Sequence, residues 1–144
     1  MLLGIDPALS PDLLRILCAM GHGDEIVIAD ANFPAEACAK KIVRSDGVDA
    51  TRLLTSILSV LPLDSYVEAP AMVMAVVEGD PENPPVVQEF QQIIDATANS
   101  ACQVAPIERF EFYRRATEAF AIVQTGERRL YGNIILKKGV VRPT

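Results

Sequence analysis

Several features that would indicate a function directly are rare or absent in this sequence: histidine, cysteine, an excess of positive charge and long apolar runs. Its 144 residues include one histidine and three cysteines, and 13 lysine and arginine residues against 19 aspartate and glutamate residues. The net charge of −6 argues against nucleic acid as a partner, because phosphate backbones are bound by an excess of positive charge on one face. No apolar run approaches the roughly 18 residues of a membrane span, so we expect no membrane partner.

The cysteines Cys18, Cys38 and Cys102 are odd in number and lack the paired spacing of a metal site. We therefore expect reduced thiols, as is usual in the cytoplasm. The N-terminus, MLLGIDPALSPDLL, lacks the basic start and the small-residue cleavage site of a signal peptide. These absences predict a cytoplasmic location and no bound metal.

Hydrophobic residues make up 50% of the chain and are spread along its whole length. This composition is typical of a compact globular protein. No linker, repeat or low-complexity segment divides the sequence, so we expect one domain over residues 1–144.

Helix and strand patterns alternate along the chain. The expected helices are residues 11–20, a second that starts at 49 or 51 and ends at 61, 86–98 and 110–116. The expected strands are residues 25–29, 71–78, 104–107, 120–124 and 133–136. Ser10 is suited to cap the first helix and Gly21 to end it. The alternation predicts an α/β fold, in which a central, mostly parallel or mixed sheet has helices on both faces.

Several common catalytic motifs are missing. There is no phosphate-binding loop, no GxGxxG after a strand and no GxSxG around a serine. The remaining polar candidates lie at the ends of expected elements, where α/β folds place ligand sites. They are His22, Asp30, Asp64, Arg109, Tyr113, Tyr131 and Asn133. Each also has an ordinary surface or turn interpretation; YGN, for example, could be a tight turn with a positive φ at Gly132 or Asn133.

Longer motifs carry more information than these single residues. Residues 20–34, MGHGDEIVIADANFP, strongly resemble the first motif of the sugar mutarotase family that includes L-fucose mutarotase and ribose pyranase. The segments RSDGVDATRLL, LPLDSY, ERFEFYRRATEAFAIVQTGE and YGNIILKKG then follow in the order of that family. The resemblance covers essentially all of residues 5–140.

The same motifs indicate a branch of the family. Ribose pyranases usually show GHTD, DAGLP and YANI at the three positions where this chain has GHGD, DANFP and YGNI. All three are similar to the fucose branch. Asn32 differs from the histidine of some bacterial fucose mutarotases, so we assign no catalytic role to position 32.

The resemblance implies exchange between the α and β anomers of free L-fucose, without cofactor or metal. By resemblance, His22 is the acid/base residue. The residues implied to hold the sugar are Asp30, Asp64, Met74, Arg109, Tyr113, Tyr131 and Asn133, with Met74 as an apolar wall. Two alternatives stay open: a mutarotase for another free sugar such as D-ribose, and a non-catalytic sugar-binding protein on the same fold.

The chemistry suits these residue types. Anomer exchange opens the hemiacetal to an aldehyde and closes it on the other face, which requires one proton acceptor and one proton donor. A positioned acid or base contributes about 10² to 10⁴-fold, and an imidazole can act in either direction near neutral pH. Tyrosine, asparagine, aspartate and arginine side chains match sugar hydroxyls as hydrogen-bond partners.

His22 and Asp30 are separated by eight positions, so on a straight strand they could not both contact one sugar within a single chain. A straight strand would hold them about 26 Å apart, at roughly 3.3 Å per residue. Either the segment curls inward at its ends or the site combines residues of more than one subunit. Members of the family are homo-oligomers, so the resemblance implies a ring-like decamer or a smaller assembly in which a shared site is one solution.

Overall fold

The computed structural model describes residues 1–144 and contains five helices and one six-stranded sheet. The strands are β1 (Glu25–Ala29), β2 (Ile42–Ser45), β3 (Ala71–Met74), β4 (Ala105–Ile107), β5 (Ala121–Thr125) and β6 (Ile134–Lys137). The helices are α1 (Pro11–Ala19), α2 (Ala35–Cys38), α3 (Ala50–Leu58), α4 (Pro85–Thr97) and α5 (Arg109–Glu118). The strand order is β2-β5-β1-β6-β3-β4.

Strand β6 is the one antiparallel member of the sheet. It pairs with β1 on one side and β3 on the other, and Ile134 lies opposite both Ile28 and Val73. The pairs β1–β5, β2–β5 and β3–β4 are parallel. The start of β6 therefore lies at the carboxyl ends of the parallel strands, and its end lies at their amino ends. The sheet is mixed, and the predicted α/β class is confirmed.

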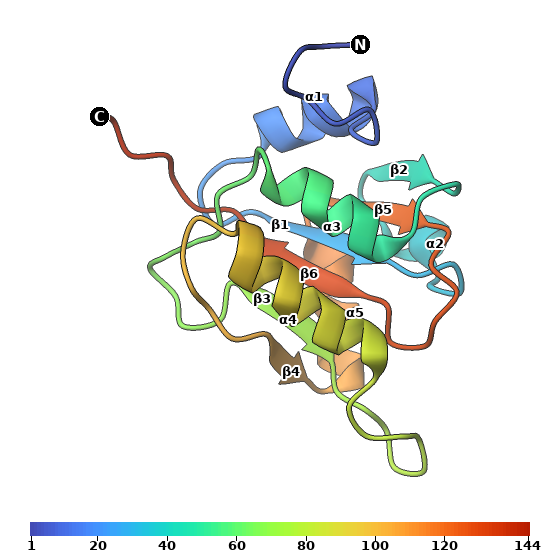
Figure 1. Cartoon of the computed structure of the whole chain (residues 1–144). Coiled ribbons are helices and arrows are strands. Elements are labelled where there is room, and N and C mark those ends of the chain that lie inside the picture. The colour runs from blue at the N-terminus through green and yellow to red at the C-terminus, as the bar shows by residue number, and fades with distance from the viewer.

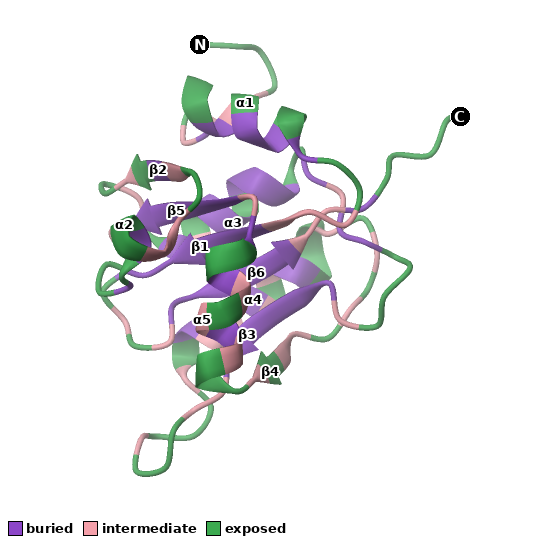
Figure 2. Cartoon of the chain, turned by 180° about the vertical axis from the view of Figure 1, so that it is seen from behind, coloured by how far each residue is buried: buried purple, intermediate pink, exposed green.

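Helices cover both faces of the sheet (Figure 1). Side chains of α1, α3 and α4 form the larger core with Ile26 and Ile28 of β1, whereas Val27 and Ala29 face the smaller core with α2 and α5. Successive residues of a strand point to opposite faces, so a strand buried on both faces is apolar throughout. Figure 2 shows the central strands as the most deeply buried layer of the chain.

Side-chain hydrogen bonds cap two of the expected helix starts. The hydroxyl oxygen of Ser10 accepts the backbone N–H of Leu13 at 3.2 Å, which caps α1. Asp49 caps α3 in the same way, accepting the N–H of Arg52 at 2.7 Å. The expected end of α3 at residue 61 was wrong, because the helix stops at Leu58.

Strand β3 is also shorter than predicted. It ends at Met74 rather than at residue 78 because its partner β4 ends at Ile107. The N–H of Ala75 makes a last bond to the carbonyl of Ile107, at 2.7 Å, and the chain then leaves the sheet. Residues 75–84 form a loop that projects from the body between β3 and α4 (Figure 1).

Two short elements were not predicted. Helix α2 and strand β2 each bury one residue, Ala35 and Val43. With so few buried positions, neither element produces a periodic pattern in the sequence.

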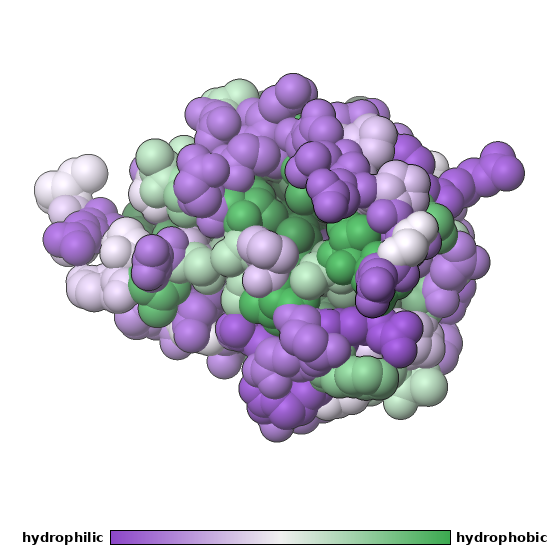
Figure 3. Space-filling view, turned by 90° about the horizontal axis from the view of Figure 1, so that it is seen from below, coloured by the Kyte–Doolittle hydropathy of each residue, from purple (hydrophilic) through white to green (hydrophobic).

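Strand β4 forms one edge of the sheet and contains an exposed proline, Pro106. Proline has no N–H to offer to a further strand, which protects an edge from strand addition. On the side of the molecule seen from below, apolar surface lies in the middle and hydrophilic side chains frame it (Figure 3). No helix in the chain has both the length and the hydropathy needed to cross a bilayer.

Candidate functional site

A cavity of about 240 Å³ opens at the carboxyl ends of β1 and β3. In α/β sheets this is the usual position of a ligand site. The sequence-predicted residues around it are Asp30, Met74, Arg109, Tyr113, Tyr131 and Asn133. They come from four separate parts of the chain, and the antiparallel course of β6 brings the last two beside the first.

Asp30 and Asn133 form a buried polar pair that lines this cavity. The N–H of Asp30 donates to Oδ1 of Asn133 at 2.7 Å, and Nδ2 of Asn133 donates to Oδ2 of Asp30 at 2.9 Å. Both residues are buried, and the N–H of Asn32 donates to Oδ1 of Asp30 at 2.9 Å. Burial raises the pKa of Asp30, while these hydrogen bonds act in the opposite direction. The pair is thus a fixed hydrogen-bonding group, with carboxylate lone pairs left to accept from a ligand.

Tyr131 forms one side of the cavity in an unusual backbone conformation. Its φ of 65° lies in the left-handed region, which bulky residues rarely occupy. The positive φ that was considered for Gly132 or Asn133 occurs at neither residue and is found at Tyr131 instead. Glycine is needed at position 132 for a different reason: a Cβ there would lie 2.5 Å from Cγ of Glu127.

The turn that carries Tyr131 is held by an ion pair between the buried Glu127 and the partly exposed Arg129. Nε and Nη2 of Arg129 donate to the two carboxylate oxygens of Glu127, each at 2.9 Å, and Nη1 reaches Glu89 of α4 at 2.7 Å. The Arg129 guanidinium lowers the pKa of Glu127 to about 2. The carbonyl of Glu127 also accepts the N–H of Ala31, at 2.8 Å, which ties this turn to the end of β1.

Helix α5 supplies two further residues that line the cavity, Arg109 and Tyr113. Arg109 is its first residue and makes no ion pair, with its guanidinium 4.8 Å from the ring centre of Phe110. Tyr113, one turn further on, stacks on Phe33 with ring centres 5.4 Å apart. Met74 adds apolar surface at the end of β3. The cavity thus combines a free cation, aromatic faces and hydroxyl groups, as a polar ligand with some apolar surface requires.

His22 lies at the other end of β1. Its Nε2 is 3.1 Å from Oδ1 of Asp64, and its ring centre is 5.4 Å from that of Tyr66. Its side chain is 46% exposed, whereas that of Asp64 is 3% exposed. The N–H of Tyr66 donates to the same Asp64 oxygen at 3.0 Å. This backbone bond, followed by His22, lowers the pKa of Asp64.

The segment that carries His22 is anchored on both sides. Gly23 has a φ of 86°, and its N–H donates to the carbonyl of Lys138 at 2.8 Å. Nζ of Lys138 donates to the carbonyls of Leu17 and Met20, at 2.7 and 2.6 Å. The end of α1 and the segment before β1 are therefore joined to the end of β6, which fixes the position of His22.

The predicted site residues fall into two groups within one chain. His22 and Asp64 lie at the amino end of β1, and the other six line the cavity at its carboxyl end. The four residue steps of β1 alone separate these ends by about 13 Å at ~3.3 Å per step. The segment does not curl inward, so His22 and Asp64 do not contribute to the cavity of their own chain.

Five residues around the cavity were not among the predicted site residues: Asn32, Phe33, Val77, Asp80 and Leu130. Phe33 and Leu130 adjoin predicted motifs, so their positions next to Asp30 and Tyr131 were an available indication. Asp80 and Val77 belong to the 75–84 loop, whose GDPENPP composition indicates only a loop. Their approach to Tyr131 depends on tertiary structure.

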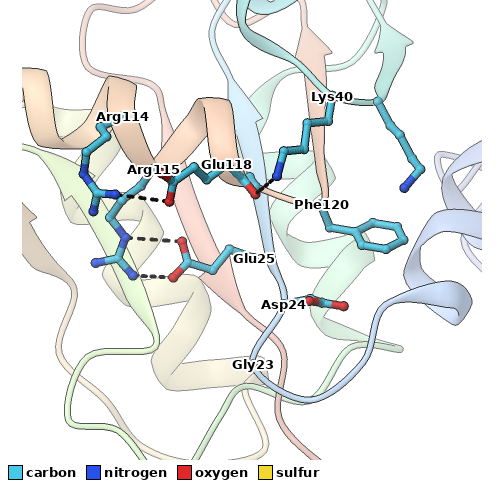
Figure 4. A pocket seen from close by; sticks show the side chains of 10 residues that line it. Gly23, Asp24, Glu25, Lys40, Arg114, Arg115, Glu118 and Phe120 are labelled. Carbon is cyan, nitrogen blue, oxygen red and sulfur yellow. Dashed lines mark hydrogen bonds and ion pairs between the residues drawn. The ribbon is translucent and has the colours of Figure 1, made fainter.

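A second cavity, of about 490 Å³, lies near the amino end of β1 and the end of α5 (Figure 4). It is lined mainly by charged groups that satisfy one another. Arg115 pairs with Glu25, Arg114 pairs with Glu118, and Nζ of Lys40 donates to the carbonyl of Glu118. Although this cavity is larger, its paired charges leave little that would recognise a ligand. Elsewhere, no three histidine, cysteine or acidic side chains are grouped so that they could hold a metal ion.

The fold and the cavity define an α/β protein with a small polar ligand site at its strand ends. The sequence model of the RbsD / FucU transport protein family matches residues 3–141, and the chain belongs to this family. It is 51% identical over 140 residues to an L-fucose mutarotase of Histophilus somni, covering 97% of both chains. It is 48% identical to an L-fucose mutarotase of Haemophilus influenzae, with the same coverage.

The chain is also similar to solved structures of related proteins. A fucose mutarotase of Streptococcus pneumoniae in complex with L-fucose superposes with a TM-score of 0.93 at 49% identity, covering 98% of this chain and all of the other. FucU of Bifidobacterium longum superposes with a TM-score of 0.91 at 43% identity, covering 96% and 99%. RbsD of Bacillus subtilis, complexed with D-ribose, shares the fold with a TM-score of 0.72 at 23% identity, covering 93% and 95%.

Proposed function

We propose that this protein is an L-fucose mutarotase, an isomerase that exchanges the α and β anomers of free L-fucose. The observation that carries the proposal is the similarity over 97–98% of the chain to proteins named for this activity, together with the polar cavity at the strand ends. Asp30, Arg109, Tyr131 and Asn133 bind the sugar hydroxyls, and Met74 and Tyr113 pack against its apolar surface.

The reaction requires only proton transfer. A base takes the proton of the anomeric hydroxyl while an acid gives a proton to the ring oxygen, and the bond between the ring oxygen and the anomeric carbon breaks. The aldehyde turns its other face to the hydroxyl group, and the reverse proton transfers close the ring as the other anomer. His22 acts as one of the two groups, since imidazole can donate or accept near neutral pH.

His22 reaches the sugar from a neighbouring subunit. Within one chain it is held at the far end of β1 from the cavity, and its side chain is half exposed. A homo-oligomer that places this end of one chain against the cavity of the next completes the site. A ring-like assembly, up to a decamer, satisfies this requirement. Asp64 then orients the imidazole of His22 that one subunit places at its neighbour's cavity. A cytoplasmic location remains a prediction.

The test is saturation-transfer NMR on the anomeric protons of free sugars. The protein should accelerate exchange between the α and β pyranose forms of L-fucose more than any exchange of D-ribose at matched concentration. Equal or greater acceleration with D-ribose would favour the alternative substrate. A non-catalytic sugar-binding protein would shift the anomer ratio only in proportion to its own amount.

A further inference from the structure

The 75–84 loop meets the cavity at the hydroxyl group of Tyr131. This hydroxyl donates to Oδ2 of Asp80 at 2.5 Å and accepts the backbone N–H of Val77 at 3.1 Å. These are the hydrogen bonds that connect residues 76–82 with another part of the chain. Asp80 and Tyr131 both line the cavity.

The two bonds determine what Tyr131 can offer to a ligand. A phenol has one proton to donate, and here Asp80 accepts it. The bond from Val77 uses part of the accepting capacity of the oxygen, and some of that capacity remains. A sugar hydroxyl that meets Tyr131 therefore has to be the donor of the bond between them.

The negative charge on Asp80 favours the hydrogen bond in which the Tyr131 hydroxyl is the donor. A hydrogen bond to a carboxylate is shorter and stronger than one between neutral groups. Burial, followed by the bond to Asp80, raises the pKa of Tyr131, so the phenol keeps its proton near neutral pH. The left-handed backbone at Tyr131 brings the ring to this position, and Asp80 then fixes its hydroxyl.

We propose that Asp80 is a positioning residue that holds the Tyr131 hydroxyl as a hydrogen-bond acceptor and so selects a sugar hydroxyl able to donate there. The inference rests on the proposed function, because it assigns Asp80 to recognition of the same monosaccharide. It also gives the 75–84 loop a role in substrate preference, since the loop provides both partners of the hydroxyl.

The experiment is a double-mutant cycle between positions 80 and 131. Asp80→Asn keeps the shape of the side chain but can present an amide donor to the phenol oxygen. It should lower kcat/KM for L-fucose about tenfold, mainly through KM, as expected for loss of a charge-assisted bond made in binding. In a Tyr131→Phe background the same change should cost less than twofold, because the group on which Asp80 acts is gone.

Glu78→Gln is the matched control. Glu78 is an exposed carboxylate on the same loop, and this change should leave kcat/KM unaltered. The inference is overturned if Asp80→Asn behaves like the wild type, or if it costs as much in the Tyr131→Phe background as in the wild type. The second result would show that Asp80 acts on its own.

A readout independent of activity separates this inference from the proposed function. The ultraviolet absorbance of tyrosinate, compared between wild type and Tyr131→Phe, isolates the ionisation of Tyr131 among the three tyrosines. Asp80→Asn should shift this ionisation to lower pH, and an unchanged titration overturns the contact itself. If the titration shifts but the wild type accelerates no anomer exchange, the proposed function fails, and with it the role of Asp80 in sugar selection.

Discussion

The carboxylate of Asp64 and the imidazole of His22 form a pair in which the acid is buried and the histidine is half exposed. Oδ1 of Asp64 lies 3.1 Å from Nε2 of His22 and also accepts the N–H of Tyr66 at 3.0 Å. The backbone bond fixes the carboxylate, and the lowered pKa of Asp64 keeps it charged near neutral pH. The carboxylate therefore favours a proton on Nε2, the ring nitrogen that faces it.

Replacing His22 with alanine should lower kcat for L-fucose exchange by about 10² or more, because a positioned acid/base group is lost. Unfolding temperature should stay close to that of the wild type, since the side chain is half exposed between two glycines. Saturation-transfer NMR and thermal unfolding measure the two effects. Near-normal exchange in the variant would mean that a tyrosine or an aspartate performs the chemistry.

Asp64→Asn should reduce kcat by roughly tenfold while leaving His22 in place, because an amide holds the ring less firmly than a carboxylate. In a His22→Ala background the same change should have little further effect on kcat, because the group on which Asp64 acts is gone. An equal loss in both backgrounds would show that Asp64 does not act through His22.

Mixed assembly tests the sharing of the site. His22→Ala and Tyr131→Ala proteins, each nearly inactive, should regain part of the activity when they are unfolded and refolded together. In mixed oligomers some cavities with an intact Tyr131 receive an intact His22 from another chain. Mass spectrometry of the intact assemblies confirms that mixing has occurred, and mixed oligomers without recovered activity would show that each subunit has a complete site.

The ion pair of Glu127 predicts sensitivity to acid. Its folded pKa of about 2 lies below the ordinary value of 4.5, so its contribution to stability is present above pH 4.5 and is lost as pH falls toward 2. Glu127→Gln should lower the free energy of unfolding at pH 7 by on the order of 2 kcal/mol. Urea unfolding at pH 7 and pH 3 should show the gap between variant and wild type shrinking at the lower pH; a constant gap would contradict the assignment.

Activity should not depend on a divalent ion. The proposed chemistry uses proton transfer alone, and the two acidic residues of the cavity, Asp30 and Asp80, already accept hydrogen bonds from Asn133 and Tyr131. After dialysis against a strong chelator, anomer exchange of L-fucose should continue at its original rate. A loss that one added divalent ion restores would refute this prediction.

Much of the fold could be predicted because local patterns and tertiary structure agree. Strand β1 was predicted residue for residue, since a short, β-branched apolar run is what a strand buried on both faces requires. The helix expected at residues 110–116 is present within α5, where Phe112 and Ala116 are fully buried. Ser10 and Asp49 marked helix starts through side-chain bonds that lie within three residues.

What the sequence could not provide depends on contacts between distant residues. The antiparallel insertion of β6 decides that Asn133 meets Asp30, and this pairing spans 103 positions. Asp64 was grouped with the sugar-binding residues by resemblance, whereas the structure places it beside His22, 42 positions away. The approach of Asp80 to Tyr131 depends in the same way on the course of a loop that has no pattern of its own.

The course of β6 has a consequence for how activity should depend on assembly. One end of this strand supports the segment that carries His22, and the other end begins at the cavity. Under the shared-site proposal, these two unlike surfaces of each chain contact different neighbours. Contacts between two unlike surfaces produce a closed ring if the rotation between neighbouring subunits brings the last subunit back to the first. Otherwise they produce an open linear assembly. Under the shared-site proposal, every cavity in a closed ring receives His22 from a neighbouring subunit. In an open linear assembly, the cavity at one end has no neighbour to provide it. Turnover per chain should then fall when dilution opens the rings, so specific activity would itself report ring closure.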